Sequence, residues 1–273
     1  MKIKKIGLFT LTAVLIGSCI HAQADQLADI KERGTLVCGV LSTLEPFGYI
    51  DASSRELVGY DVDFCNSVAK KLGVKAEFRQ LSLDARIPEL NQGRVDVLAA
   101  VLGYTPARAG QVDFSRSYFL SEQKLAVQES SQFKTLADVD GKRVSSIKGS
   151  STQIMIQKAI PGAKIISYDD APSAFMALAQ RKVDGFGITE VMLRRFIAKL
   201  GDNAKILVLD QPIGQEPWGL GVKKGEPTLL AAVNNSLDEM ESSGEAAQIF
   251  DKWMGKGTIY GMERKFKVQP ITP

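Results

Sequence analysis

Residues 90–119, LNQGRVDVLAAVLGYTPARAGQVDFSRSYF, connect a predicted buried strand to a short helix. The apolar run VDVLAAVL favours a strand, and the helix begins after it with Thr105 as N-cap and Pro106 as its first residue. This start places Arg108 in the first turn, where free backbone N–H groups already make the local potential positive. Arg108 therefore either points into solvent or faces a bound carboxylate that the same N–H groups attract.

Strand and helix patterns alternate over most of the chain. A strand at 34–41 precedes a helix at 60–73, and a second cycle places a strand at 142–147 before a helix at 150–162. Such alternation predicts βαβ units with mostly parallel sheets flanked by helices. Because the order repeats, we expect two α/β lobes with a ligand crevice at the carboxyl ends of their strands.

Residues 1–24 have the three parts of a secretory signal peptide: a basic start, an apolar centre too short to span a bilayer, and AQA before Asp25. The segment IGSC at 16–19 would instead suit a lipoprotein anchored through Cys19. Ser18 is less usual at that position and AQA lies close by. We therefore expect a soluble periplasmic protein cleaved after residue 24.

The remaining composition excludes several classes of function. Residues 1–24 hold three of the 34 basic residues and none of the acidic ones, so 31 basic residues balance 31 acidic residues in the rest of the chain. This balance does not indicate a nucleic-acid partner or an anionic membrane surface. His21, the single histidine, also lies in this segment, which excludes Ser-His-Asp catalysis and histidine-ligated metal sites. We expect no catalytic residue, no metal and no cofactor.

Two cysteines, Cys38 and Cys65, remain in the predicted mature chain. The first lies in a predicted strand and the second on the apolar face of the helix at 60–73. An oxidising compartment permits a disulfide between them, and two buried thiols are equally compatible with the sequence.

A second helix start lies at GSST, residues 149–152. Gly149 allows a tight turn from strand to helix, and Ser150, Ser151 and Thr152 offer hydroxyl and backbone N–H groups to an anion. Ordinary capping by serine or threonine is the alternative interpretation. Together with Arg108, this start could clamp one carboxylate between two lobes.

Four segments of the chain resemble the periplasmic amino-acid-binding proteins of ABC importers, the bacterial extracellular solute-binding protein family 3. They are residues 59–73, 90–119, 146–152 and 242–255. Within them, the Thr-x-x-Arg element followed by Asp-Phe-Ser is fairly specific. Residues 214–227, GQEPWGLGVKKGEP, are most similar to the glutamate/aspartate-binding branch of that family.

The resemblance implies a two-lobe periplasmic binding protein fold, also called the Venus-flytrap fold. It places residues 25–119 and 218–273 in lobe 1 and residues 123–213 in lobe 2. The two lobes would be joined by hinge crossings near 120–122 and 214–217.

The resemblance also implies a ligand site. The arginine of the Thr-x-x-Arg element, here Arg108, and the N–H groups of Ser151 and Thr152 would hold the ligand α-carboxylate, with Ser150 beside them. Backbone groups around Val101 and Gly103 would meet the α-amino group.

This chain departs from the family pattern at the positions that contact the rest of the ligand. Thr189 replaces the aspartate that usually pairs with the α-ammonium, and Glu190 would take that role only after a register shift of one residue. Leu41 replaces the arginine of acidic-amino-acid binders, and Leu44 replaces the aromatic lid residue. Since a buried carboxylate without a cation is costly, we expect a ligand other than glutamate or aspartate.

We therefore predict the monomeric solute-binding component of an ABC transporter, which captures an amino acid or related small carboxylate and delivers it to membrane permease subunits. A dehydratase on the same fold, acting on cyclohexadienyl or arogenate-type substrates through Glu190, is one alternative. A ligand sensor for a chemoreceptor is another.

Overall fold

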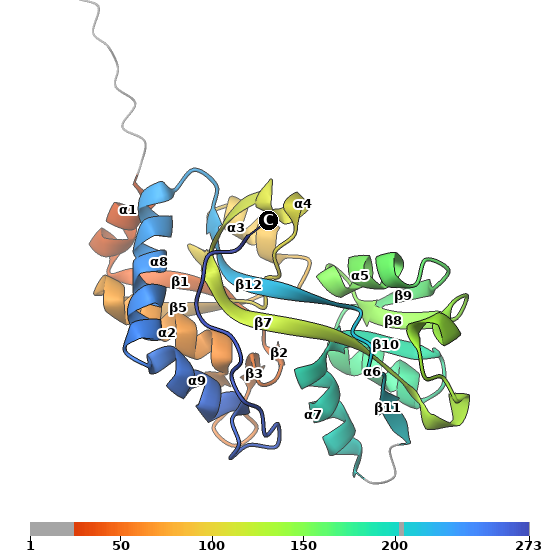
Figure 1. Cartoon of the computed structure of the whole chain (residues 1–273). Coiled ribbons are helices and arrows are strands. Elements are labelled where there is room, and N and C mark those ends of the chain that lie inside the picture. The colour runs from red at the N-terminus through yellow and green to blue at the C-terminus, as the bar shows by residue number, and fades with distance from the viewer. Residues whose placement is uncertain (1–24, 202–204, 273) are drawn as a thin grey trace, which may run out of the picture.

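The computed structural model describes residues 25–201 and 205–272, so the predicted signal peptide and Cys19 lie outside the described residues. Two α/β lobes stand side by side and are connected by two long strands, β7 (Val112–Gln128) and β12 (Gly214–Lys223) (Figure 1). The predicted two-lobe α/β fold is thereby confirmed. Within the described ranges, no helix is both long enough and apolar enough to cross a membrane.

The first lobe combines the N-terminal elements with the last two helices of the chain (Figure 1). Its helices are α1 (Gln26–Arg33), α2 (Tyr60–Leu72), α3 (Arg86–Asn91), α4 (Pro106–Ala109), α8 (Pro227–Ser242) and α9 (Glu245–Met254). Its strands are β1 (Thr35–Val40), β2 (Thr43–Leu44), β3 (Gly48–Ile50), β4 (Leu57–Val58), β5 (Lys75–Gln80) and β6 (Val97–Leu98).

The second lobe is formed by the middle of the chain (Figure 1). After the short 3-10 turns η1 (Glu129–Ser131) and η2 (Leu136–Val139), strands and helices alternate as the sequence predicts. They are β8 (Arg143–Ile147), α5 (Ser151–Ala159), β9 (Lys164–Tyr168), α6 (Ala171–Ala179), β10 (Gly185–Thr189), α7 (Glu190–Leu200) and β11 (Ile206–Val208).

One continuous sheet runs through both lobes in the order β5-β1-β6-β12-β7-β10-β8-β9, with β11 paired to β7. Within each lobe β1 pairs parallel with β5 and β6, and β8 pairs parallel with β9 and β10. The pairs that involve β7 or β12 are antiparallel. The expected mostly parallel sheets are therefore present, and an antiparallel ribbon joins them at the centre.

The two predicted hinge segments lie opposite each other in this ribbon. Ser121 pairs with Glu216, and Leu120 pairs with Pro217. The ladder extends from the Gly214–Gln123 pair to the Lys223–Val112 pair. The lobe boundaries predicted from the sequence stay predictions, but their crossings fall on strands that hydrogen-bond to each other.

The apolar run at 95–102 forms a shorter strand than its pattern predicts. β6 covers only Val97–Leu98, although the whole run is buried. Beyond the end of β6, Val101 has a φ of 45°, and its N–H donates to Asp61 over 2.9 Å. Contacts outside the sheet thus satisfy backbone groups that a longer strand would have paired.

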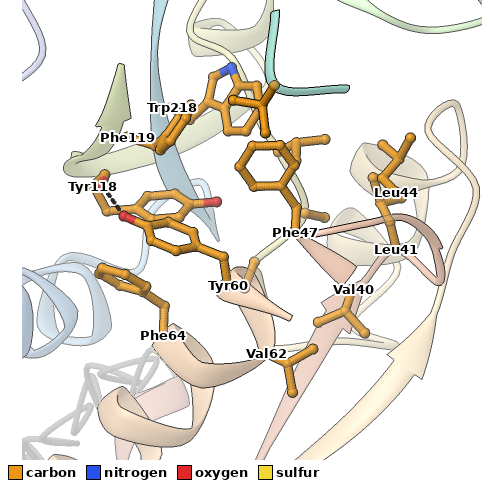
Figure 2. Close-up of a cluster of buried hydrophobic side chains, with 14 of the residues drawn as sticks. Val40, Leu41, Leu44, Phe47, Tyr60, Val62, Phe64, Tyr118, Phe119 and Trp218 are labelled. Carbon is orange, nitrogen blue, oxygen red and sulfur yellow. Dashed lines mark hydrogen bonds between the residues drawn. The ribbon is translucent and has the colours of Figure 1, made fainter. Parts of the chain in front are cut away.

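A cluster of aromatic side chains fixes the ribbon to the first lobe. Phe119 on β7 and Trp218 on β12 pack with their ring centroids 4.8 Å apart, and Phe47 lies 4.8 Å from the Trp218 ring (Figure 2). Tyr60 on α2 stacks on Tyr118 and donates its hydroxyl to the Tyr118 carbonyl over 2.8 Å. This packing holds the ribbon residues next to Trp218 in a defined position.

A disulfide joins Cys38 on β1 to Cys65 on α2, so the structure selects the bonded alternative. Both cysteines are fully buried in the core of the first lobe. The bond holds α2 against the central strand of that lobe.

Reduction of this disulfide should lower the free energy of unfolding by about 3 to 4 kcal/mol, because the bond closes a loop between residues 27 positions apart. Urea unfolding with and without reductant measures the difference. The Cys38→Ala, Cys65→Ala double variant is the control and should not respond to reductant. Two titratable thiols in the denatured, unreduced protein would contradict the assignment.

Candidate functional site

A narrow cavity lies where the two lobes and the ribbon meet. Its volume is about 30 Å³, room for about two water molecules. It is lined by Leu44, Phe47, Leu83, Arg86 and Val101 from the first lobe, Ile147, Ser150, Ser151, Thr152, Ile188, Thr189 and Met192 from the second, and Gln123, Glu216 and Trp218 from the ribbon. A ligand of amino-acid size therefore enters only if the lobes move apart.

The lobes touch at the rim of this cavity through the turn that precedes α5. Gly149 has a φ of 75°, and a Cβ at this position would lie 2.9 Å from the Cα of Asp84 in the first lobe. Lys148 forms an ion pair with Asp84 over 3.2 Å, and Arg195 on α7 forms another with Glu45. Glycine at 149 thus permits a close approach that a side chain would prevent.

Arg108 does not extend into solvent. Its Nη1 donates to the carbonyl of Gly103 over 2.8 Å, and its Nη2 reaches across the lobe boundary to the carbonyl of Gly149, also over 2.8 Å. Burial lowers the pKa of Arg108, and the nearby charge of Glu216 opposes that decrease. The side chain lies beside the cavity rather than among its lining residues.

Arg86, the first residue of α3, is a second buried cation that the sequence analysis missed. It is 2% exposed and donates to the carbonyls of Leu83 (2.8 Å), Ala100 (2.7 Å) and Val101 (2.9 Å). Its Nη2 also faces the Gly149 carbonyl over 3.3 Å. Burial, together with the charge of Arg108, lowers the pKa of Arg86 to about 9, so it stays cationic at neutral pH.

The position of Arg86 in the sequence could have identified it as a candidate site residue. Like Arg108, it is a cation in the first turn of a helix, where the backbone dipole disfavours positive charge. The same argument applied to both helix starts would have selected both arginines.

Glu216 on β12 is the second functional candidate that the sequence analysis missed. It is 3% exposed, and its Oε1 accepts from Trp218 Nε1 over 2.9 Å and from Gln123 Nε2 over 3.2 Å. Its Oε2 is buried and has no hydrogen-bond partner in the part of the chain that the structure describes. The carboxylate lies against Gly103, where a Cβ would overlap it.

The start of α5 faces the cavity as the sequence predicts. Ser151 and Thr152 are buried cavity-lining residues, and no side chain caps this helix start. The Thr152 hydroxyl donates to Gln123 Oε1 over 2.8 Å, while the Ser150 hydroxyl lies 3.2 Å from that of Ser146. The first N–H groups of a nine-residue helix are thereby presented to the cavity.

The carbonyls of Val101 and Gly103 already accept from arginine side chains in this structure, Val101 from Arg86 and Gly103 from Arg108. The Val101 N–H donates to Asp61. These two carbonyls and the Val101 N–H are among the backbone groups predicted to meet the α-amino group, and in this structure they already have hydrogen-bond partners in the first lobe.

Four other predicted positions differ in their relation to the cavity. Thr189 and Leu44 line it, whereas Leu41 lines a neighbouring cavity of about 290 Å³ that also includes Leu44. Glu190 is not brought to the site: it receives two hydrogen bonds from Arg194, at 2.6 and 3.0 Å, and lies 3.5 Å from Lys124.

Glu190 belongs instead to the lining of a larger cavity, about 510 Å³, beside α7 and the C-terminal segment. Charged side chains of that cavity pair with each other, as Glu190 does with Arg194 and Lys256 with Glu263. The charges of the narrow cavity are less evenly paired: its lining includes Glu216, whose Oε2 has no partner among the described residues, and Arg86, with Arg108 beside the cavity. Its chemistry, rather than its size, makes it the candidate site.

Asp61, at the start of α2, supports the loop that forms one wall of the site. It is 1% exposed and accepts hydrogen bonds from Tyr118 (2.7 Å) and from the Val101 N–H (2.9 Å). Burial raises the pKa of Asp61 to about 7, although these hydrogen bonds oppose the increase. No group of three or more histidine, cysteine, aspartate or glutamate residues within 25–201 and 205–272 is arranged to hold a metal ion.

Comparison with known proteins places these features in context. Residues 36–256 match the model of a family described as bacterial extracellular solute-binding proteins, family 3. The ABC transporter glutamine-binding protein of Bacillus subtilis (strain 168) is 31% identical over 268 residues, which cover 93% of this chain and 97% of that protein. The L-cystine-binding protein of Escherichia coli (strain K12) is 28% identical over 247 residues, covering 89% and 92%.

Among solved structures, an ancestral arginine-binding protein bound to arginine has a TM-score of 0.75 and 35% sequence identity, covering 82% of this chain and 99% of that chain. A glutamate/aspartate import solute-binding protein of Salmonella typhimurium (strain LT2) is 26% identical over 272 residues, covering 93% of this chain and 89% of that protein. The family predicted from the sequence is thus confirmed. The chain is similar to binding proteins for several different amino acids.

The buried carboxyl of Asp61 should make stability depend on pH. Its pKa of about 7 in the folded protein lies above the ordinary value of 3.8, so the folded state keeps a proton that the unfolded state loses. Stability should therefore fall as pH rises from about 4 to 7, by up to about 1.4 kcal/mol per pH unit. The Asp61→Asn variant cannot ionise and should lack this contribution. If the unfolding free energies of the wild type and of Asp61→Asn change by the same amount between pH 4 and pH 7, this contribution of Asp61 is refuted.

Proposed function

The chain belongs to the bacterial extracellular solute-binding proteins, family 3, and on that premise we propose that it captures an amino acid between its lobes and delivers it to the permease of an ABC importer. Proteins of this family act outside the cytoplasm. We further propose that the protein works as a periplasmic monomer after cleavage of residues 1–24.

The observation that carries the proposal is the meeting of two guanidinium groups at one carbonyl. Arg108 and Arg86 of the first lobe both point at the carbonyl of Gly149 in the second, at 2.8 and 3.3 Å. A carbonyl offers only a partial charge, whereas a carboxylate offers a full charge and two oxygens for charge-assisted hydrogen bonds. Hydrogen bonds from these arginines to an amino-acid carboxylate would therefore be stronger than their present hydrogen bonds to the Gly149 carbonyl.

The start of α5 strengthens this assignment. We infer that its N–H groups at Ser151 and Thr152, which line the cavity together with Ser150, share the ligand carboxylate with Arg108, whose side chain lies beside the cavity. A carboxylate held from both sides would stabilise the lobes in contact, which is how ligand binding shifts such an equilibrium.

The identity of the amino acid depends on the remaining walls of the cavity. Leu44, Phe47, Ile188 and Met192 supply apolar surface, which favours a side chain that is less polar than that of glutamate. Arg86 adds a cation, but backbone carbonyls already occupy three of its donors at 2.9 Å or less. The glutamine-binding and cystine-binding relatives match this chain at higher identity than the glutamate/aspartate import protein does. Assignment of the chain to the glutamate/aspartate branch therefore stays a prediction.

The dehydratase alternative has less support from the site. A general acid must reach the substrate, and Glu190 lies outside the narrow cavity with Arg194 and Lys124 as partners. A sensor that presents the closed form to a chemoreceptor would use the same binding site as a transporter component.

Ligand-free protein, prepared by unfolding and refolding, should be stabilised by its amino acid. A ligand at 100 times its Kd adds about 2.7 kcal/mol to the free energy of unfolding. Differential scanning fluorimetry with the common amino acids, L-cystine and simple organic acids measures this effect as an increase in Tm. The absence of a Tm shift with every amino acid would contradict the proposed function.

Replacement of Arg108 by alanine should weaken binding of every carboxylate ligand by about 30-fold or more, because truncating one partner of a buried charge pair costs at least about 2 kcal/mol. Isothermal titration calorimetry gives the two Kd values. Arg94→Ala is the matched control, since Arg94 pairs with Glu89 on the exposed side of the same lobe and should leave Kd unchanged. Equal affinity of Arg108→Ala and wild type would remove Arg108 from the site.

A further inference from the structure

We propose that Glu216, on the ribbon strand β12, is the residue that binds the ammonium group of the ligand. The inference rests on the proposed function, because it assigns the second charge of a zwitterion bound in the same cavity. Glu216 would be the specificity-determining residue, because Thr189 carries no charge and Glu190 is paired with Arg194 and Lys124 outside the cavity.

The hydrogen-bond state of Glu216 is the first argument. One oxygen is held by Trp218 and Gln123, which fix the orientation of the carboxylate. The other oxygen, Oε2, is buried and without a partner among the described residues, and Glu216 lines the narrow cavity. A buried carboxylate oxygen without a donor is costly, and a ligand ammonium with three N–H donors would remove that cost.

The position of Glu216 relative to Arg108 is the second argument. Both side chains contact the same residue, Gly103: Arg108 donates to its carbonyl over 2.8 Å, and the Glu216 carboxylate packs on its Cα. A cationic and an anionic side chain thus contact the same residue, Gly103. The carboxylate and ammonium of an α-amino acid are likewise attached to a single carbon, and each protein charge is opposite in sign to the ligand charge that it would face.

The connections of Glu216 are the third argument. Gln123 donates to Glu216 and accepts from Thr152 at the start of α5. The groups proposed for the ammonium and for the carboxylate therefore belong to one hydrogen-bonded chain that crosses from the ribbon into the second lobe. A ligand that contacts both ends would order the ribbon and this lobe together.

The test compares amino acids with analogues that lack only the α-amino group. The probe pairs are L-glutamine with glutaramate, L-glutamate with glutarate, and L-arginine with 5-guanidinopentanoate. For each amino acid that the wild type binds, Glu216→Gln should raise its Kd by about 30-fold or more. The Kd of the matching analogue should not rise, because its carboxylate still meets Arg108 and a repelling charge has been removed.

Glu190→Gln is the matched control, since it removes a carboxylate that lies 3.5 Å from Lys124 on the ribbon strand β7 but outside the narrow cavity, and it should leave both Kd values unchanged. If Glu216→Gln fails to fold, Gly103→Ala replaces it: the added Cβ displaces the Glu216 carboxylate and should produce the same selective loss.

Two results would overturn the assignment of Glu216. An equal rise in both Kd values would make it a structural counter-ion of the arginines, and unchanged binding of the amino acid would exclude contact with the ammonium. Absence of binding of any amino acid to the wild type would instead contradict the proposed function, so the two failures can be told apart.

Discussion

Two arginines of the first lobe meet at its junction with the second, Arg86 fully buried and Arg108 partly buried, and a buried guanidinium is tolerated only when acceptors surround it. Arg86 obtains them from a loop that leaves the central sheet, where the carbonyls of Ala100 and Val101 turn toward it. Arg108 obtains them from Gly103 and, across the lobe boundary, from Gly149. The early end of β6, the left-handed Val101 and the close approach at Gly149 all follow from this requirement.

The ribbon supplies the negative charge that these cations need. Phe119 and Trp218 anchor β7 and β12 in the aromatic core of the first lobe (Figure 2). Trp218 also donates to Glu216. Because Glu216 lies in the ladder that crosses between the lobes, its carboxylate is held where the two lobes join. The same strands thus connect the two lobes and carry the carboxylate that we propose binds the ligand ammonium.

The sequence predicts the local features of this protein well. Thr105 and Pro106 specify a helix start, strand and helix patterns specify two α/β lobes, and the position of Arg108 in a first turn indicates an unusual environment. These signals lie within a few neighbouring residues. The second helix start at 149–152 is likewise proposed from its residues as the partner of Arg108, and the resemblance implies the same pair.

The remaining features depend on contacts between residues far apart in the chain. Glu216 becomes a buried carboxylate only because β12 pairs with β7 and because Gly103 leaves space for it. The run at 95–102 has the composition of a strand, and only the demand of Arg86 and Asp61 for backbone partners ends it after Leu98. Glu190 is adjacent to Thr189 in sequence, yet the start of α7 turns its side chain toward Arg194.

A crystal structure of the protein with its bound amino acid would show which residues hold the two ligand charges. We expect the ligand carboxylate to contact Arg108 and the N–H groups at the start of α5, and the ligand ammonium to lie within hydrogen-bond distance of Glu216 Oε2. A ligand bound with its carboxylate away from Arg108, or in the larger cavity beside α7, would contradict this expectation.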